Sequence, residues 1–183
     1  MLARLAVLFA FAVALAMPAA AQTPASPDNI LVLETNKGTV EIALRPDLAP
    51  QHVARIKELA REGFYDGVVF HRVIDGFMAQ TGDPTGTGAG GSKLPDLKAE
   101  FTATPYQRGT VGMARTAQST DTANSQFFIM FNRVPSLDGQ YTVFGEVTEG
   151  MNVVDTIKKG SQSANGQVTN PDKILKAYIK ADK

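Results

Sequence analysis

The chain has 183 residues, of which 44% are hydrophobic, enough for one domain with a buried core. Its 18 basic and 18 acidic residues give a formal net charge of +0, which argues against a partner held by bulk electrostatics, such as nucleic acid or an anionic membrane. The sequence contains no cysteine, so disulfides, thiolate catalysis and cysteine-based metal sites are excluded.

Residues 1–21 have the pattern of a secretory signal peptide. Arg4 precedes an apolar run from Leu5 to Met17, and a proline and three alanines follow. The run is short of the ~20 residues of a membrane-spanning helix, although a retained membrane anchor is the alternative interpretation. We expect cleavage after Ala21, which an intact mass beginning at Gln22 would show. The mature protein is then expected in the periplasm, or secreted if the cell has no outer membrane, with no membrane attachment.

A short linker, residues 22–29, precedes the folded domain that we expect at residues 30–181. Near its start, two apolar runs flank the turn sequence Asn36-Lys37-Gly38, which predicts a β-hairpin. A helix is predicted from Leu48 until Gly63, because apolar side chains recur there at helical spacing. These side chains are Val53, Ile56, Leu59 and Ala60.

The remaining chain predicts more strands than helices. Strands are expected over residues 68–74, 108–114, 125–131, 141–147 and 173–180, and a second short helix over residues 150–160. About eight strands and two helices, joined by hairpins or irregular loops, favour a mainly β fold. We expect a closed eight-stranded antiparallel barrel capped by two α-helices, with an open sandwich as the alternative.

No motif in the sequence marks an acid–base or metal site. Two histidines occur, His52 and His71, and neither belongs to a carboxylate cluster, so we expect no metal and no cofactor. The chain has no Gly-x-Ser-x-Gly motif, which argues against a triad hydrolase. The glycine-rich run at residues 86–92 lacks the Gly-Lys-Ser/Thr ending of a phosphate loop.

Arg72 is unusual because it interrupts a strand that is otherwise rich in Val, Ile and Phe. The simplest interpretation is that Arg72 is a solvent-exposed charge on an edge strand. Side chains alternate between the two faces of a strand, so Arg72 and His71 should point to opposite faces. We expect the histidine to be buried and the arginine to be exposed. Alternation in residues 125–131 likewise places an exposed Phe128 beside Gln126, which suggests a binding surface. The opposite, core-facing set is Phe127, Ile129 and Phe131.

Several short motifs occur in a fixed order along the chain. They are FHRVI-x-GFM-x-Q at residues 70–80, GMA at 112–114, SQFFI at 125–129, LDG at 137–139 and VFGEVTEGMNVVD at 143–155. In order and spacing they resemble the cyclophilins, a family of peptidyl-prolyl cis-trans isomerases, over residues 30–179. MARTA at 113–117, together with the signal-peptide pattern, is similar to the bacterial exported branch.

The resemblance implies a barrel fold, an activity and a set of site residues. Arg72 matches the family's catalytic arginine, Gln80 the residue that positions it, and Phe128 part of the adjoining proline pocket; we assign these three residues to catalysis. Residues that match the family's substrate-binding positions are Phe77, Met78, Ala114, Arg115, Gln126, Leu137 and Tyr141.

The expected function is therefore isomerisation of X-Pro bonds in unfolded or flexible segments of proline-containing polypeptides, by a monomer. A proline-peptide-binding module or a chaperone with little turnover is the alternative. Ser136 stands where cyclosporin-sensitive family members have a tryptophan, so weak binding of that cyclic peptide is expected. Arg115 and Tyr141 replace an asparagine and a histidine at the rim of the groove.

Overall fold

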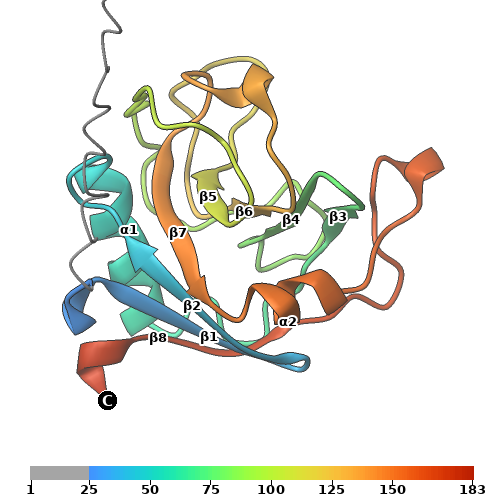
Figure 1. The fold of residues 1–183 in the computed structure, drawn as a ribbon, viewed down its shortest axis with the longest axis horizontal. Helices are drawn as coiled ribbons and strands as arrows, with labels where there is room; N and C mark the ends of the chain where they lie inside the picture. Colours follow the sequence, from blue (N-terminus) through green and yellow to red (C-terminus); the bar gives the residue numbers. More distant parts are fainter. Residues whose placement is uncertain (1–24) are drawn as a thin grey trace, which may run out of the picture.

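The computed structural model describes residues 25–183, and one eight-stranded antiparallel sheet dominates it (Figure 1). The strands are β1 (Ile30–Thr35), β2 (Gly38–Leu44), β3 (Arg72–Ile74), β4 (Met78–Thr81), β5 (Thr110–Met113), β6 (Phe127–Met130), β7 (Val143–Glu149) and β8 (Ile174–Ile179). Their order across the sheet is β3-β4-β6-β5-β7-β2-β1-β8. The predicted signal peptide lies outside the described residues.

The sheet curls until its edge strands, β3 and β8, approach each other. The two edges meet through the segments that precede these strands, with an isolated bridge between Val69 and Lys173. The amide of Phe70 donates to the carbonyl of Asp172 at 2.9 Å, and the amide of Ile174 donates to the carbonyl at position 68 at 2.9 Å. The mainly β, eight-stranded fold is therefore as predicted, but irregular segments rather than a continuous ladder complete the barrel.

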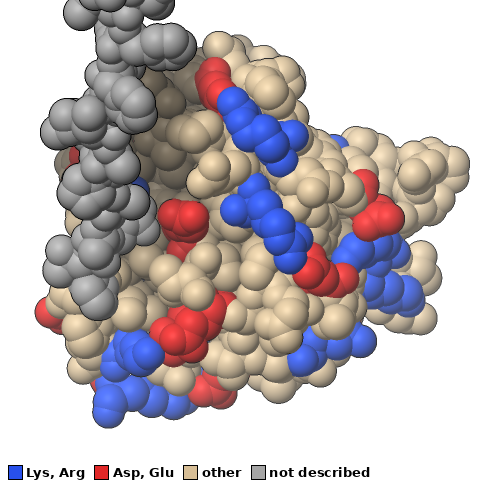
Figure 2. Space-filling model, in the orientation of Figure 1, with Lys and Arg blue, Asp and Glu red and all other residues tan. Residues whose placement is uncertain are grey.

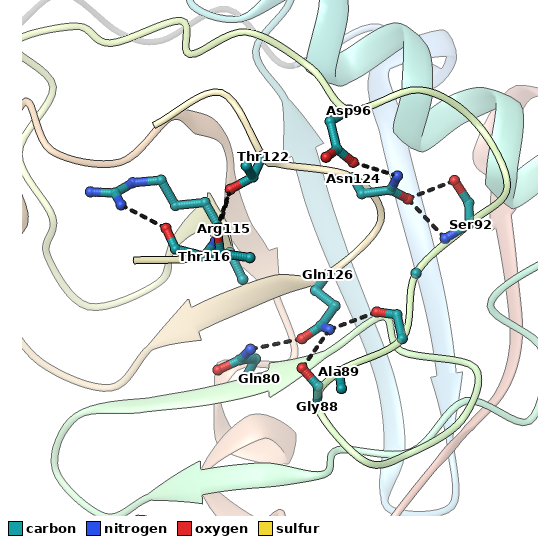
Figure 3. Close-up of a pocket in the computed structure, with 13 residues that line it drawn as sticks. Gln80, Gly88, Ala89, Ser92, Asp96, Arg115, Thr116, Thr122, Asn124 and Gln126 are labelled. Carbon is teal, nitrogen blue, oxygen red and sulfur yellow. Dashed lines mark hydrogen bonds between the residues drawn. The ribbon is translucent and has the colours of Figure 1, made fainter. Parts of the chain in front are cut away.

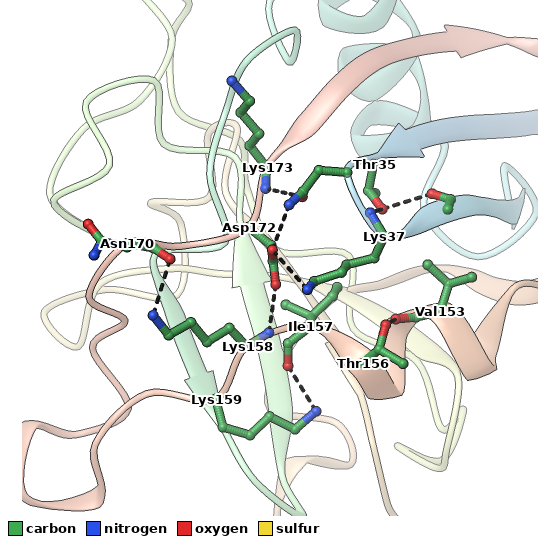
Figure 4. Close-up of polar contacts among 12 residues, drawn as sticks. Thr35, Lys37, Val153, Thr156, Ile157, Lys158, Lys159, Asn170, Asp172 and Lys173 are labelled. Atoms are coloured by element: carbon green, nitrogen blue, oxygen red, sulfur yellow. Dashed lines mark hydrogen bonds and ion pairs between the residues drawn. The ribbon is translucent and has the colours of Figure 1, made fainter.

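The predicted hairpin is β1–β2. Hydrogen bonds and an ion pair connect its turn to Asp172, in the segment that precedes β8. Asp172 accepts hydrogen bonds from the side-chain amide of Asn36 at 2.7 Å and from the backbone amide of Lys158 at 2.8 Å (Figure 4). Lys37 lies 3.6 Å from the same carboxylate. Burial alone would raise the pKa of Asp172, but these interactions outweigh it and lower the pKa.

The predicted first helix is α1 (Pro50–Arg61), which packs against β8. All of its predicted core positions are buried, which confirms the helical spacing read from the sequence. Pro50 suits the first turn, where a backbone N–H has no helical partner. Glu100 accepts hydrogen bonds from the amides of Gln51 and His52, so a distant loop caps the helix.

Two elements differ from the prediction. The second helix, α2 (Met151–Thr156), is shorter than residues 150–160 because Ile157 leaves the helical conformation, with ψ of 132°. The strand expected at residues 68–74 is regular from Arg72 onwards, and a separate strand, β4, follows it. Gly76 has φ of +71°, so the chain reverses there and β4 pairs with β3 as a hairpin.

The two faces of β6 contribute to two different hydrophobic clusters. Phe127, Ile129 and Phe131 belong to the main core, as alternation predicts. Phe128 and Met130 belong to a second, smaller cluster on the other face. Phe128 is only 6% exposed, so the expectation of an exposed ring was wrong: aromatic neighbours from other segments cover it.

Charged side chains are mixed rather than segregated. On the face shown in Figure 2, acidic and basic groups lie next to each other. Ion pairs at the surface of the described residues include Arg108–Asp155 and Arg133–Asp138. Among residues 25–183, no helix is long and apolar enough to cross a membrane.

Candidate active site

Four adjacent strands align three of the predicted site residues in one row. Arg72 of β3 pairs with Gln80 of β4, Gln80 pairs with Phe128 of β6, and Phe128 pairs with Gly112 of β5. Residues directly opposite each other in an antiparallel ladder project from the same face. The arginine, the glutamine and the aromatic ring therefore stand side by side on the outer face of the sheet, although they are far apart in the sequence.

The guanidinium of Arg72 is held by neutral oxygen atoms. Nη1 donates to Gln80 Oε1 at 3.1 Å, Nε donates to the carbonyl of Asn165 at 3.0 Å, and Nη2 donates to Asn165 Oδ1 at 3.1 Å. A guanidinium has five N–H donors, so these three bonds leave two N–H groups without an acceptor among residues 25–183. None of the carboxylates in this part of the chain forms an ion pair with Arg72, so its charge is not neutralised locally.

A chain of amides extends from the arginine into the neighbouring loop (Figure 3). Gln80 Nε2 donates to Gln126 Oε1 at 2.9 Å. Gln126 Nε2 in turn donates to the carbonyls of Gly88 and Gly90, at 3.0 and 2.8 Å. Each amide uses its oxygen on one side and its nitrogen on the other, which fixes the orientation of Gln80 toward the arginine.

An apolar pocket of about 110 Å³ lies beside the guanidinium. Its wall residues are Arg72, Phe77, Met78, Gln80, Ala114, Arg115, Phe128, Leu137 and Tyr141. Met78 and Phe128 are 1% and 6% exposed, so this part of the pocket wall is tightly packed into the protein. Such a pocket can take a small apolar ring and hold a neighbouring backbone amide close to Arg72.

Aromatic contacts fix the ring of Phe128. It stacks on Tyr106 with ring centroids 5.7 Å apart and an interplanar angle of 23°, and it meets Tyr141 edge-on at 5.7 Å and 88°. The guanidinium carbon of Arg115 lies 4.6 Å from the centre of the Tyr141 ring. The rim of the pocket is therefore held by packing that the sequence motifs alone did not indicate.

A second, more polar pocket adjoins the first and shares Gln80, Ala114 and Arg115 with it. Its glycine-rich wall is organised by Asp83, a fully buried residue whose carboxylate accepts amide hydrogen bonds from Gly88 at 2.6 Å and Gly90 at 3.1 Å. Burial would raise the pKa of Asp83, but hydrogen bonds from Thr85 and from these two amides lower it to about 2. At neutral pH the ionised carboxylate of Asp83 therefore holds the glycine-rich wall in place. Because the two pockets share three wall residues and adjoin each other, we refer to them together as the groove.

His71 is buried, as predicted, and is 5% exposed. Burial lowers the pKa of its imidazole, so the ring is neutral at pH 7. Partial burial also lowers the pKa of Arg72, but an arginine whose ordinary pKa is 12.5 remains charged there.

The structure brings the ten predicted site residues together in this groove. Nine line the apolar pocket, and Gln126 lines the polar one beside it. Sequence reasoning missed Asn165, which contacts Arg72, and Tyr106, which supports Phe128. Asn165-Gly166 is a turn signal that could have marked the first, whereas nothing local marks the second.

The structure thus combines a curled antiparallel sheet with a small pocket whose wall includes Arg72, an arginine that forms no ion pair with a carboxylate of residues 25–183. Comparison with known sequences gives the family. Residues 30–179 match the family described as "Cyclophilin type peptidyl-prolyl cis-trans isomerase/CLD". The chain belongs to this family and is a cyclophilin-type peptidyl-prolyl cis-trans isomerase.

Individual relatives agree with the family assignment. A probable peptidyl-prolyl cis-trans isomerase of Brucella suis is 58% identical over 169 residues, 86% of each chain. A peptidyl-prolyl cis-trans isomerase of Helicobacter pylori is 47% identical over 132 residues, which are 70% of this chain and 80% of that one. The crystal structure of the cyclophilin AquaCyp293 from Hirschia baltica superposes with a TM-score of 0.78 at 29% identity, covering 87% of this chain and 76% of that one.

Proposed function

We propose that this isomerase accelerates rotation about X-Pro bonds by non-covalent stabilisation of the twisted amide, with Arg72 as the hydrogen-bond donor. Amide resonance makes the barrier to rotation ~18–20 kcal/mol, and spontaneous exchange takes ~10–100 s. In the twisted state the prolyl nitrogen recovers its lone pair and can accept a hydrogen bond that the planar amide cannot accept. A donor that acts only on the twisted state lowers the barrier without a proton transfer or a covalent step.

One observation carries this proposal: Arg72 has two N–H groups without an acceptor among residues 25–183 and lies in the wall of the apolar pocket. The pocket is suited to hold the proline ring, and Gln80 and Asn165 orient the guanidinium without cancelling its charge. A similar structure from Cryptosporidium parvum, with a TM-score of 0.75 and 29% identity over 82% of this chain and 98% of that one, was determined in the presence of the dipeptide ala-pro. It supports placing a prolyl residue in this groove.

Flexible or unfolded polypeptide segments are the substrates we propose, because the polar pocket adjoins the proposed proline pocket and offers space for residues next to the proline. The signal-peptide pattern at residues 1–21 supports a periplasmic location, or a secreted one in a cell without an outer membrane. A protease-coupled assay on a short chromogenic X-Pro peptide tests the activity. Acceleration proportional to protein concentration is expected, whereas binding of the peptide without acceleration would indicate a binding module.

The rate should be nearly independent of pH around neutrality. Burial lowers the pKa of His71 below its ordinary 6.5, and its charged neighbours, Asp83 and Arg72, keep their charges in this range. No group of the proposed mechanism therefore changes protonation between about pH 6.5 and 8.5, and kcat/KM should vary by less than about twofold. A bell-shaped profile centred near pH 7 would instead implicate His71 in proton transfer.

Weak cyclosporin binding is also part of the proposal. Ser136 is exposed on a short 3-10 turn, residues 135–137, beside Leu137 of the pocket, and it offers neither an indole N–H nor a large apolar face. Ser136→Trp should tighten binding of the drug roughly 5- to 30-fold, since a buried aromatic contact can contribute ~1–2 kcal/mol. Fluorescence titration of both forms measures this. Tight binding by the unsubstituted chain, or no gain in the variant, would exclude Ser136 as the determinant.

A further inference from the structure

Asn165 contacts the catalytic arginine proposed above from the side opposite Gln80. It follows a one-turn 3-10 helix, η3 (Gln162–Ala164), in the loop that lies beside β3 (Figure 1). Its backbone carbonyl and its side-chain oxygen accept from Nε and Nη2 of Arg72, at 3.0 and 3.1 Å. Since Gln80 holds Nη1, both edges of the planar guanidinium are fixed.

The loop is built to present these two oxygens together. Asn165 adopts the left-handed conformation, with φ of +53° and ψ of +36°, which asparagine tolerates better than most residues. Gly166 follows with φ of +80°, and a side chain there would come within 2.4 Å of Ile74. The loop is therefore pressed against β3, and the amide of Val73 donates to the Gly166 carbonyl at 2.8 Å.

We propose that Asn165 is a positioning residue for catalysis, which holds Arg72 with neutral oxygens so that its remaining N–H groups face the twisted amide with the full positive charge. A carboxylate in this place would hold the guanidinium as firmly but would pair with its charge. The inference rests on the proposed role of Arg72. Asn165 is exposed and does not line the proline pocket, so its side chain serves neither the core nor ring binding.

The test is Asn165→Gly, which removes the side-chain oxygen but keeps the left-handed backbone and its carbonyl. We expect kcat to fall about 3- to 10-fold with KM nearly unchanged, because one of three bonds to the arginine is lost. Asn170→Gly is the matched control: Asn170 is also exposed and left-handed, with φ of +52°, but none of its hydrogen bonds reaches Arg72. Its kinetics should equal those of the unsubstituted chain.

The same substitution in an Arg72→Ala background separates positioning from a structural role. If Asn165 acts through the arginine, Asn165→Gly causes no further loss of the residual activity there. An equal loss in both backgrounds, or no loss in the parent chain while Arg72→Ala is impaired, would overturn the inference and leave the arginine mechanism intact. Full activity of Arg72→Ala would overturn both proposals.

Discussion

Arg72→Ala is expected to reduce kcat/KM roughly 10- to 150-fold. A hydrogen bond from a charged donor contributes ~1.5–3 kcal/mol, and the proposed bond exists only in the twisted state of the amide. The loss should appear in kcat, because the pocket walls that we propose hold the proline ring, including Phe77, Met78 and Leu137, are unchanged. The protease-coupled assay over a range of peptide concentrations separates kcat from KM.

The fold of this variant should be intact, since Arg72 is partly exposed and does not belong to the main hydrophobic core. A melting temperature within a few degrees of the parent would show this. Arg61→Ala serves as the control for loss of a surface arginine, because Arg61 pairs with Asp182 away from the groove. Undiminished turnover by Arg72→Ala would contradict the arginine mechanism.

Gly112→Ala is expected to destabilise the chain and to lower its activity, although Gly112 lines neither of the two pockets. A Cβ atom at this position would lie 2.2 Å from the Tyr106 hydroxyl and 2.7–2.8 Å from its ring. Tyr106 is fully buried and stacks on Phe128, so it cannot move without displacing a ring that lines the proposed proline pocket. Replacing glycine by alanine commonly stabilises a chain by ~0.4–1 kcal/mol through the unfolded state, but overpacking costs ~1–3 kcal/mol. We expect the cost of overpacking to exceed the stabilisation, so the variant should have a lower free energy of unfolding than the parent chain.

Chemical denaturation measures the change in unfolding free energy, and the peptide assay measures the effect on KM. Combining Gly112→Ala with Tyr106→Phe tests this clash. Tyr106→Phe removes the hydroxyl oxygen that would lie 2.2 Å from the new Cβ atom, and it keeps the ring that stacks on Phe128. The double variant should recover part of the lost stability. Unchanged stability of Gly112→Ala, or purely additive effects of the two substitutions, would show that Tyr106 and position 112 do not interact.

The elements that depend on local pattern could be predicted from the sequence. The β1–β2 hairpin follows from a turn sequence between apolar runs, and the buried face of α1 follows from helical spacing. Alternation in β6 correctly placed Phe127 and Phe128 on opposite faces of the sheet, because successive side chains of a strand point to opposite faces. The burial of Phe128 was not predictable in this way, since Tyr106 and Tyr141 reach it from other segments.

The motif resemblance located the groove residues, but it did not show how they are connected. The cross-strand row from Arg72 to Gly112 depends on strand order, in which β6 lies between β4 and β5. The contact between Arg72 and Asn165 joins residues 93 positions apart through the irregular part of the barrel. Neither the order nor that junction leaves a periodic signal in the sequence, because both are set by packing between distant segments.

Exchange NMR on an Ala-Pro peptide with a small amount of the protein tests the central claim most directly, because it observes the two isomers without a coupling protease. With the unsubstituted chain, exchange between the cis and trans forms should be accelerated far beyond the spontaneous ~10–100 s timescale. With Arg72→Ala, the peptide should still bind, as shown by shifted resonances, while exchange slows roughly 10- to 150-fold relative to the unsubstituted chain. Binding by the unsubstituted chain without accelerated exchange, or equal acceleration by both proteins, would contradict the account.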